Sequence, residues 1–150
     1  MTLAADLGKL LNDEIPISKT MGIRDFQLSK TQFSFELPLQ PNINHKGTLF
    51  GGSLYSAGAL ACYGLFLSGL RDQSIATKNI VIAEGGMKYL APVDANAKVE
   101  ATWNSDQERI QFFKTLQSKK KARVLMRAQV LVGQQICAEF SGFFVAHITG

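Results

Sequence analysis

The chain has few of the residues that build metal sites and disulfide frameworks. Its 150 residues include only two cysteines and two histidines. Cys62 and Cys137 lie in apolar runs that are typical of small core residues, and neither stands at a zinc-site spacing from His45 or His147. Phosphate loops of the form G-x-x-x-x-G-K-S/T or G-x-G-x-x-G are absent, and Ser53 lacks the trailing glycine of a G-x-S-x-G nucleophile. We therefore expect no metal ion and no cofactor.

Charged residues are absent from one long segment, Gly47 to Leu70. Because a run of this length can span a bilayer, a membrane helix is one interpretation. Its glycines and serines, however, lower its hydrophobicity below that of a lipid-facing span. A helix that is apolar or small on every side is equally expected where a soluble domain wraps around it. We therefore predict a long buried helix and no membrane partner.

The net charge is +4, and much of the excess comes from one basic cluster: Lys119, Lys120, Lys121, Arg123 and Arg127. Such a cluster is either a solvated loop or a site for a phosphate-bearing molecule. It has no interleaved aromatic residues, so we expect no nucleic-acid partner. The first residues, Met1 to Asp6, lack the basic start and apolar run of a signal peptide, and we expect a cytoplasmic protein.

Most of the remaining chain has the pattern of β-strands. Apolar residues alternate with polar ones, or run almost unbroken, in the segments 33–39, 79–89, 97–104, 123–132 and 136–148. The turn at Gly133-Gln134 joins the last two segments into a hairpin. A glycine pair, Gly85-Gly86, follows Glu84 and indicates a bulge or a close approach of two backbones.

Two further helices are predicted. Leucines at helical spacing between Leu3 and Leu11 form a stripe suited to covering a sheet. The sequence from Ser105 to Glu108 has the form of a capping box, so a helix should begin there. The order is then a short helix, two strands, a long helix, two strands, a short helix and a closing hairpin. This order predicts one α+β domain over residues 1–150, with the long helix enclosed by a curved antiparallel sheet of about six strands.

The stretch before the long helix carries the strongest functional signal. Asn44 and His45 precede the glycine pair Gly51-Gly52, where the helix is expected to begin. Backbone N–H groups at a helix N-terminus have no intrahelical partner, and the helix dipole is positive there. Glycine lets a substrate approach this backbone closely. The stretch can therefore hold a polarised carbonyl or an oxyanion without a charged side chain.

These residues resemble a known motif. Asn44-x-x-Gly47-x-x-Phe50-Gly51-Gly52 is similar to the N-x-x-G-x-x-H-G-G motif of hotdog-fold acyl-CoA thioesterases. The wider stretch from Asn42 to Leu54 resembles a thioesterase domain family that also occurs fused behind an acetyltransferase domain. The resemblance implies a hotdog fold and hydrolysis of an acyl-CoA or acyl-carrier thioester. It also implies a homodimer or a dimer of dimers.

The resemblance implies a role for each matching position. Asn44 would contact the thioester or the attacking water, Gly51 would supply the N–H of an oxyanion hole, and Gly52 would let the acyl group pass. The expected substrate-binding residues are Asn42, Gly47, Phe50, Gly51, Gly52 and Ser53, although Asn42 is also simply explained as a loop-organising residue. Two positions depart from the family: Phe50 replaces the motif histidine, and Ala59 stands where many relatives place an acid on the helix.

The general base must therefore come from elsewhere if the protein is a hydrolase. Glu84 is one candidate, on a strand that lies at the subunit interface of hotdog dimers, and an outward-facing strand carboxylate is the alternative interpretation. His45 is the second candidate, with an exposed loop histidine as its alternative. Lysines and arginines such as Lys88, Lys119, Lys121 and Arg123 could hold the phosphates of coenzyme A. A non-catalytic acyl-thioester-binding module remains the rival function, whereas a dehydratase would need the missing histidine and helix acid.

Overall fold

The computed structural model describes residues 3–149, so Met1, Thr2 and Gly150, at the ends of the expected domain, lie outside the described residues. The helices are α1 (Leu3–Glu14), α2 (Pro16–Met21), α3 (Gly51–Asp72) and α4 (Asp106–Lys119), with a short 3-10 helix at Gln40–Asn42. The strands are β1 (Arg24–Leu28), β2 (Gln32–Leu37), β3 (Ile80–Tyr89), β4 (Ala97–Trp103), β5 (Lys121–Val132) and β6 (Gln135–His147). The predicted order of elements is confirmed, with α2 as an addition that the sequence analysis missed.

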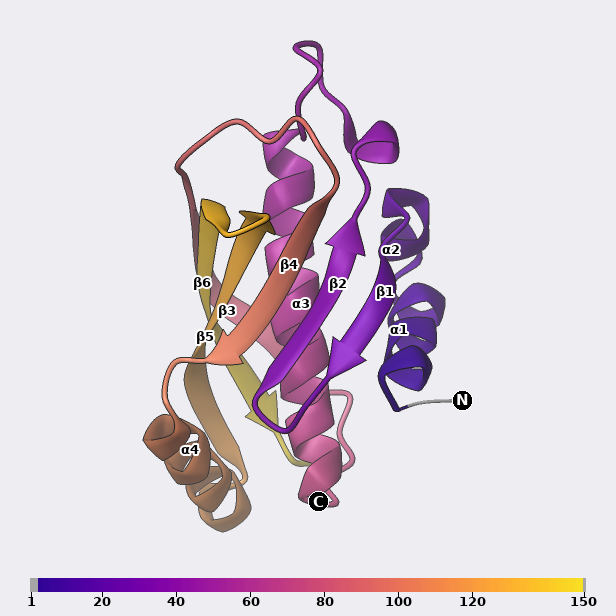
Figure 1. Ribbon diagram of the computed structural model, residues 1–150. Helices are drawn as coiled ribbons and strands as arrows, with labels where there is room; N and C mark the ends of the chain where they lie inside the picture. Colours follow the sequence, from indigo (N-terminus) through magenta and orange to yellow (C-terminus); the bar gives the residue numbers. More distant parts are fainter. Residues whose placement is uncertain (1–2, 150) are drawn as a thin grey trace.

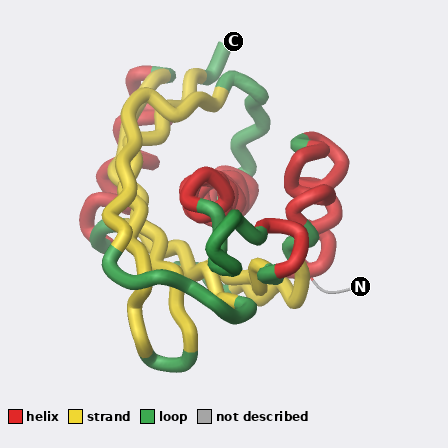
Figure 2. The backbone as a smooth tube through the Cα atoms, turned by 90° about the horizontal axis from the view of Figure 1, so that it is seen from above, coloured by secondary structure: helices red, strands yellow, loops and turns green. Residues whose placement is uncertain are grey.

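All the strands join one antiparallel sheet in the order β1-β2-β4-β5-β6-β3. The sheet curves around α3, which runs through the middle of the molecule (Figure 1). Seen along α3, the sheet encloses one side of the helix while α1 and α2 stand on the other (Figure 2). The α+β architecture predicted from the sequence is therefore confirmed, including its closing β5–β6 hairpin.

Helix α3 is a core helix whose sequence allows close packing. By length and composition alone it could cross a membrane, but 61% of its apolar 18-residue stretch is buried inside the protein. Two of its glycines press against the sheet. A methyl group on Gly58 would lie 2.7 Å from Cβ of Phe140, and one on Gly69 would lie 2.7 Å from the ring of Trp103. Glycine at these positions lets the helix approach the strands more closely than any other residue would.

Helices α1 and α4 pack on different strands of the sheet. Leu7 and Leu11 of α1 are buried, and the helix packs on β1 and α3, as its leucine stripe predicts. The capping box of α4 is also confirmed, since the Ser105 hydroxyl accepts from the N–H of Glu108 at 3.1 Å. Phe112 of α4 packs against Phe66 near the end of α3, with ring centroids 5.2 Å apart. Helix α4 therefore lies beside the C-terminal part of α3.

Strand β3 forms one edge of the sheet. It pairs with β6, and within residues 3–149 no strand pairs with its other edge. Val81 and Ile82 are 54% and 41% exposed on this edge. The register shifts between Ile82 and Glu84, so the bulge predicted near the glycine pair is present. A long, exposed and apolar edge strand is a surface that proteins normally cover.

Candidate functional site

The loop before α3 is organised by Asn44. Its Oδ1 accepts from the backbone N–H groups of Lys46 and Thr48, at 2.9 and 3.0 Å, and its Nδ2 donates to the Thr48 hydroxyl at 2.9 Å. Gly47 takes a φ of +79°, a left-handed conformation that favours glycine. The side chain of Asn44 is therefore engaged within its own loop, a structural role that the motif alone did not reveal.

Asn42 anchors the same loop to the preceding segments of the chain. Its side chain is buried, and Nδ2 donates to the carbonyls of Met21 and Pro38 at 2.9 and 2.8 Å. Its backbone carbonyl accepts from the N–H of Phe50 at 2.8 Å. Both side-chain donors are therefore used inside the protein, which agrees with the loop-organising interpretation.

The start of α3 is open. Phe50, the N-cap residue, is extended, with φ −60° and ψ 133°, and no side chain among the described residues caps the helix. The N–H groups of Gly51 and Gly52 belong to the first turn, so they have no intrahelical acceptor. The phenol of Tyr89 donates to the Gly51 carbonyl at 2.9 Å, which ties β3 to this turn. The side chain of Phe50 is 56% exposed beside it.

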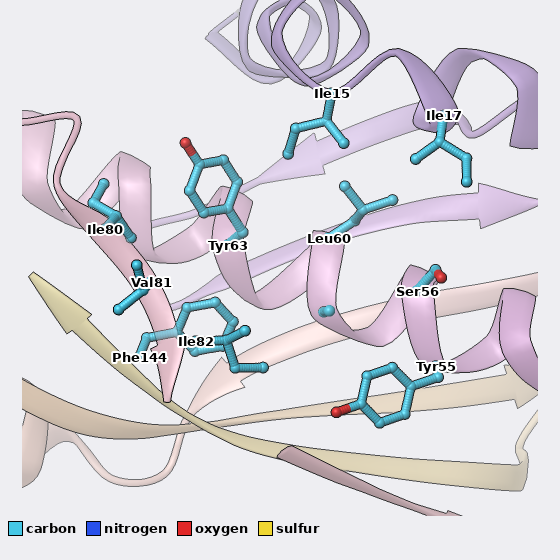
Figure 3. Close-up of a pocket in the computed structure, with 11 residues that line it drawn as sticks. Ile15, Ile17, Tyr55, Ser56, Leu60, Tyr63, Ile80, Val81, Ile82 and Phe144 are labelled. Atoms are coloured by element: carbon cyan, nitrogen blue, oxygen red, sulfur yellow. The ribbon is translucent and has the colours of Figure 1, made fainter. Parts of the chain in front are cut away.

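An apolar groove of about 330 Å³ runs along α3 and begins about one turn beyond Gly51, at Tyr55 and Ser56. Its floor is one face of α3, formed by Tyr55, Ser56, Ala59, Leu60 and Tyr63. Its walls are the α1–α2 junction and β3 with the adjoining β6, contributing Ile15, Ile17, Ile80, Val81, Ile82 and Phe144 (Figure 3). Ala59, which stands where many relatives carry an acid, thus opens into this groove.

Sequence analysis missed the groove residues Tyr55, Ser56 and Tyr63. A signal was available, because Gly52, Ser56, Ala59 and Tyr63 recur at the spacing of one helix face. That spacing is uninformative in residues 51–70, which carry no charge, since every face of this part of the helix is apolar or small. Only the position of the sheet edge shows which face stays uncovered.

The two candidate bases come from different elements, the loop before α3 and strand β3. His45 is exposed in the loop. Gly85 faces α3, because a methyl group on it would lie 2.5 Å from the Tyr55 hydroxyl. Successive strand residues point to opposite faces, so Glu84 points to the outer face, beside its register partner Phe143. Within one chain, therefore, the Glu84 side chain does not face the open N–H groups.

The basic side chains are divided between two ends of the molecule. Lys119, Lys121 and Arg123 lie at the α4–β5 junction, near the C-terminal part of α3, and the Arg123 guanidinium stacks 4.0 Å from the ring centroid of Phe143. Lys88 alone among the four expected phosphate ligands adjoins Tyr89, which contacts the first turn of α3. The basic cluster is thus not gathered around the helix start of its own chain.

Comparisons with known proteins agree with this geometry. Residues 4–148 match the model of a family described as "Putative thioesterase (yiiD_Cterm)". The structure resembles a protein of unknown function from Chlorobaculum tepidum, with a TM-score of 0.88 and 30% identity over 98% of this chain and 95% of that one.

Two further solved structures share the architecture. A putative thioesterase from Shewanella oneidensis has a TM-score of 0.86 and 29% identity over 97% of this chain and 98% of that one. A Pseudomonas aeruginosa protein shares the fold at 23% identity, with a TM-score of 0.77 over 98% of this chain and 97% of that one. The chain therefore belongs to this family of thioesterase-like proteins and has its hotdog fold.

Proposed function

We propose that the protein hydrolyses an acyl-CoA or acyl-carrier thioester. The observation that supports this most strongly is the apolar groove that begins about one turn beyond the uncapped start of α3. The N–H of Gly51 suits the developing oxyanion, because the helix dipole and the lack of an intrahelical acceptor both favour negative charge there. The groove suits the acyl chain of the same substrate.

The reaction needs water and one base. The water oxygen attacks the thioester carbonyl carbon while the base removes a proton from the water, and the carbonyl oxygen accepts a hydrogen bond from Gly51. Collapse of the tetrahedral intermediate breaks the carbon–sulfur bond. The leaving thiolate takes up a proton, so the products are a carboxylic acid and a free thiol. Glu84 and His45 remain the candidate bases, and in this proposal the base reaches the site from a second subunit.

The proposal therefore includes a homodimer or a dimer of dimers. The unpaired, apolar edge of β3 supports it, because a second copy would cover Val81 and Ile82. At micromolar concentration we expect light scattering to give at least twice the mass of a single chain. A monomer under these conditions would contradict both the dimer and a base supplied across it.

Asn44 provides a test of the loop. We expect Asn44→Ala to lower kcat by about 10- to 100-fold, because the loop that leads into the oxyanion site loses its hydrogen bonds while the main backbone donor remains. Asn44→Asp is the matched variant, since a carboxylate can still accept from Lys46 and Thr48. Wild-type turnover by Asn44→Asp would show that Asn44 acts through the loop, whereas an equal loss in both variants would indicate direct contact of its amide with the thioester or water.

A non-catalytic acyl-thioester-binding module is the second candidate function. It is favoured by one observation, namely that the groove lining includes no carboxylate and has Ala59 at the position of the acid in many relatives. A thiol-release assay over short, medium, long and aromatic acyl-CoAs separates the two functions. Turnover supports the hydrolase, while binding of acyl-CoA without turnover supports the binding module.

A further inference from the structure

A second hollow continues the acyl groove along α3. It lies toward the C-terminal end of the helix and is lined by Leu10, Glu14, Tyr63, Leu67, Arg71 and Lys78, among others. Tyr63 is the residue that the linings of the two spaces share. On one side of its ring the lining is apolar, and on the other side it includes charged residues from α1, α3 and the segment before β3.

Tyr63 is placed to close the apolar part. Figure 3 shows its ring at the Ile80 end of the groove, with Ser56 and Tyr55 at the opposite end. Burial raises the pKa of the Tyr63 phenol, the charge of Glu14 raises it further and Arg71 opposes the rise. The side chain is thus a neutral, half-buried ring between an apolar and a charged compartment.

The length of the apolar part can be estimated from the helix. At about 1.5 Å per residue, the rise from Gly51, which carries the proposed oxyanion donor, to Tyr63 is about 18 Å, and the groove lines the part from Tyr55 onward. Helical side chains lean toward the N-terminus, so the ring of Tyr63 occupies the last part of this length. A zigzag chain with bonds of about 1.5 Å advances about 1.25 Å per carbon. The space between the oxyanion site and the ring therefore fits about 8 to 12 carbons.

The volume gives a similar answer by a separate route. A methylene group is close in size to a water molecule, whose share of liquid volume is about 30 Å³. A groove of about 330 Å³ thus holds on the order of ten carbons. The absence of charge among its lining residues favours a hydrocarbon over a polar occupant.

We propose that Tyr63 ends the acyl groove and thereby restricts the substrate to unbranched acyl chains of about 8 to 12 carbons. This inference rests on the proposed thioesterase function and assigns its substrate class. Tyr63 acts here as a specificity-determining residue, because longer chains would have to displace its ring or enter the charged compartment.

The test compares kcat/KM for acyl-CoAs of increasing chain length in the wild type, Tyr63→Ala and Tyr63→Phe. In the wild type we expect kcat/KM to rise by up to about fourfold per added methylene and then to fall beyond about 12 carbons. Tyr63→Ala should join the two spaces and raise the ratio of the 16-carbon to the 10-carbon substrate by about tenfold or more. Tyr63→Phe keeps the ring and should keep the wild-type profile.

Other outcomes are equally informative. An unchanged dependence of kcat/KM on chain length in folded Tyr63→Ala would overturn the inference. So would a Tyr63→Ala variant that differs from the wild type only in its oligomeric state, because the groove would then hold a second copy of the chain. Should Tyr63→Ala fail to fold, Tyr63→Leu tests the same point. Absence of turnover in the wild type on every substrate would instead reject the proposed function. The dependence of fatty acyl-CoA binding on chain length, compared between the wild type and Tyr63→Ala, would still test whether the Tyr63 ring limits the groove.

Discussion

Replacement of Gly51 by proline is expected to lower kcat for thioester hydrolysis by about 10²- to 10³-fold, the usual cost of losing one oxyanion-hole donor. Proline has no backbone N–H, so the change removes the proposed donor and no side-chain contact. The N–H of Gly51 has no intrahelical acceptor. Its loss therefore breaks no hydrogen bond of the helix and should affect chemistry far more than folding.

The local geometry suits this substitution. Gly51 is the first residue of α3, a position where proline is favoured because its fixed φ matches the helix. Phe50 has ψ 133°, which is the conformation that a residue before proline prefers. A Cβ at position 51 would lie 3.5 Å from the nearest atom of the Tyr89 ring, an ordinary van der Waals contact. The folded protein should thus accommodate the ring.

Gly51→Ala is the matched control, since it adds the Cβ and keeps the N–H. We expect Gly51→Ala to keep kcat within a few-fold of the wild type and Gly51→Pro to lose it, with both unfolding at similar urea concentrations. KM should change less than kcat, because an oxyanion donor acts chiefly in the transition state. Equal rates for the proline and alanine variants would remove Gly51 from the reaction.

Periodicity predicted most of the fold because burial follows it closely. In β5, every second residue from Ala122 to Val130 is buried, so the alternation in the sequence reports the inner face of the sheet directly. The start of α4 was predicted from the Ser105 capping pattern, because an N-cap depends only on neighbouring residues. Helix α2 was missed because it is short and begins at Pro16, so it offers too few turns for an apolar stripe to be recognised.

The site was predicted less completely. The helix start at Gly51 was predicted correctly, since a helix start depends on local sequence. The roles of Asn42 and Asn44 in organising the loop depend on which carbonyls and N–H groups the folded chain brings near them. The groove and Tyr63 depend on where the sheet ends, and a sequence read one segment at a time does not contain that information.

Glu84→Gln is the second change with a large expected effect. If Glu84 is the base, kcat should fall by about 100-fold or more, because the amide keeps the shape and hydrogen-bonding reach of the side chain but no longer accepts a proton. Binding of a non-hydrolysable acyl-CoA analogue should barely change. In a single chain Glu84 points to the outer face of β3, so this prediction requires that the carboxylate serve the site of a partner subunit.

That requirement makes a complementation experiment decisive. Glu139→Gln is the matched control, since Glu139 is another outer-face carboxylate, paired in register with Lys88 on the neighbouring strand. Its rate should stay at the wild-type level. Mixed dimers of Glu84→Gln with Gly51→Pro subunits should regain up to half of the wild-type activity per dimer, because one of the two shared sites would then contain both an intact donor and an intact base.

The remaining outcomes assign the base by elimination. If Glu84→Gln keeps its rate while His45→Gln loses it, the base is His45, which lies in the loop beside Asn44. If mixed dimers regain nothing although each variant alone is inactive, base and donor belong to the same subunit. The outward direction of Glu84 in its own chain then argues against Glu84 as the base. If neither variant changes turnover, a carboxylate or imidazole at these positions is not needed. If the wild type instead binds acyl-CoA without turnover, the lack of an acid at Ala59 makes the acyl-thioester-binding module the better account of this site.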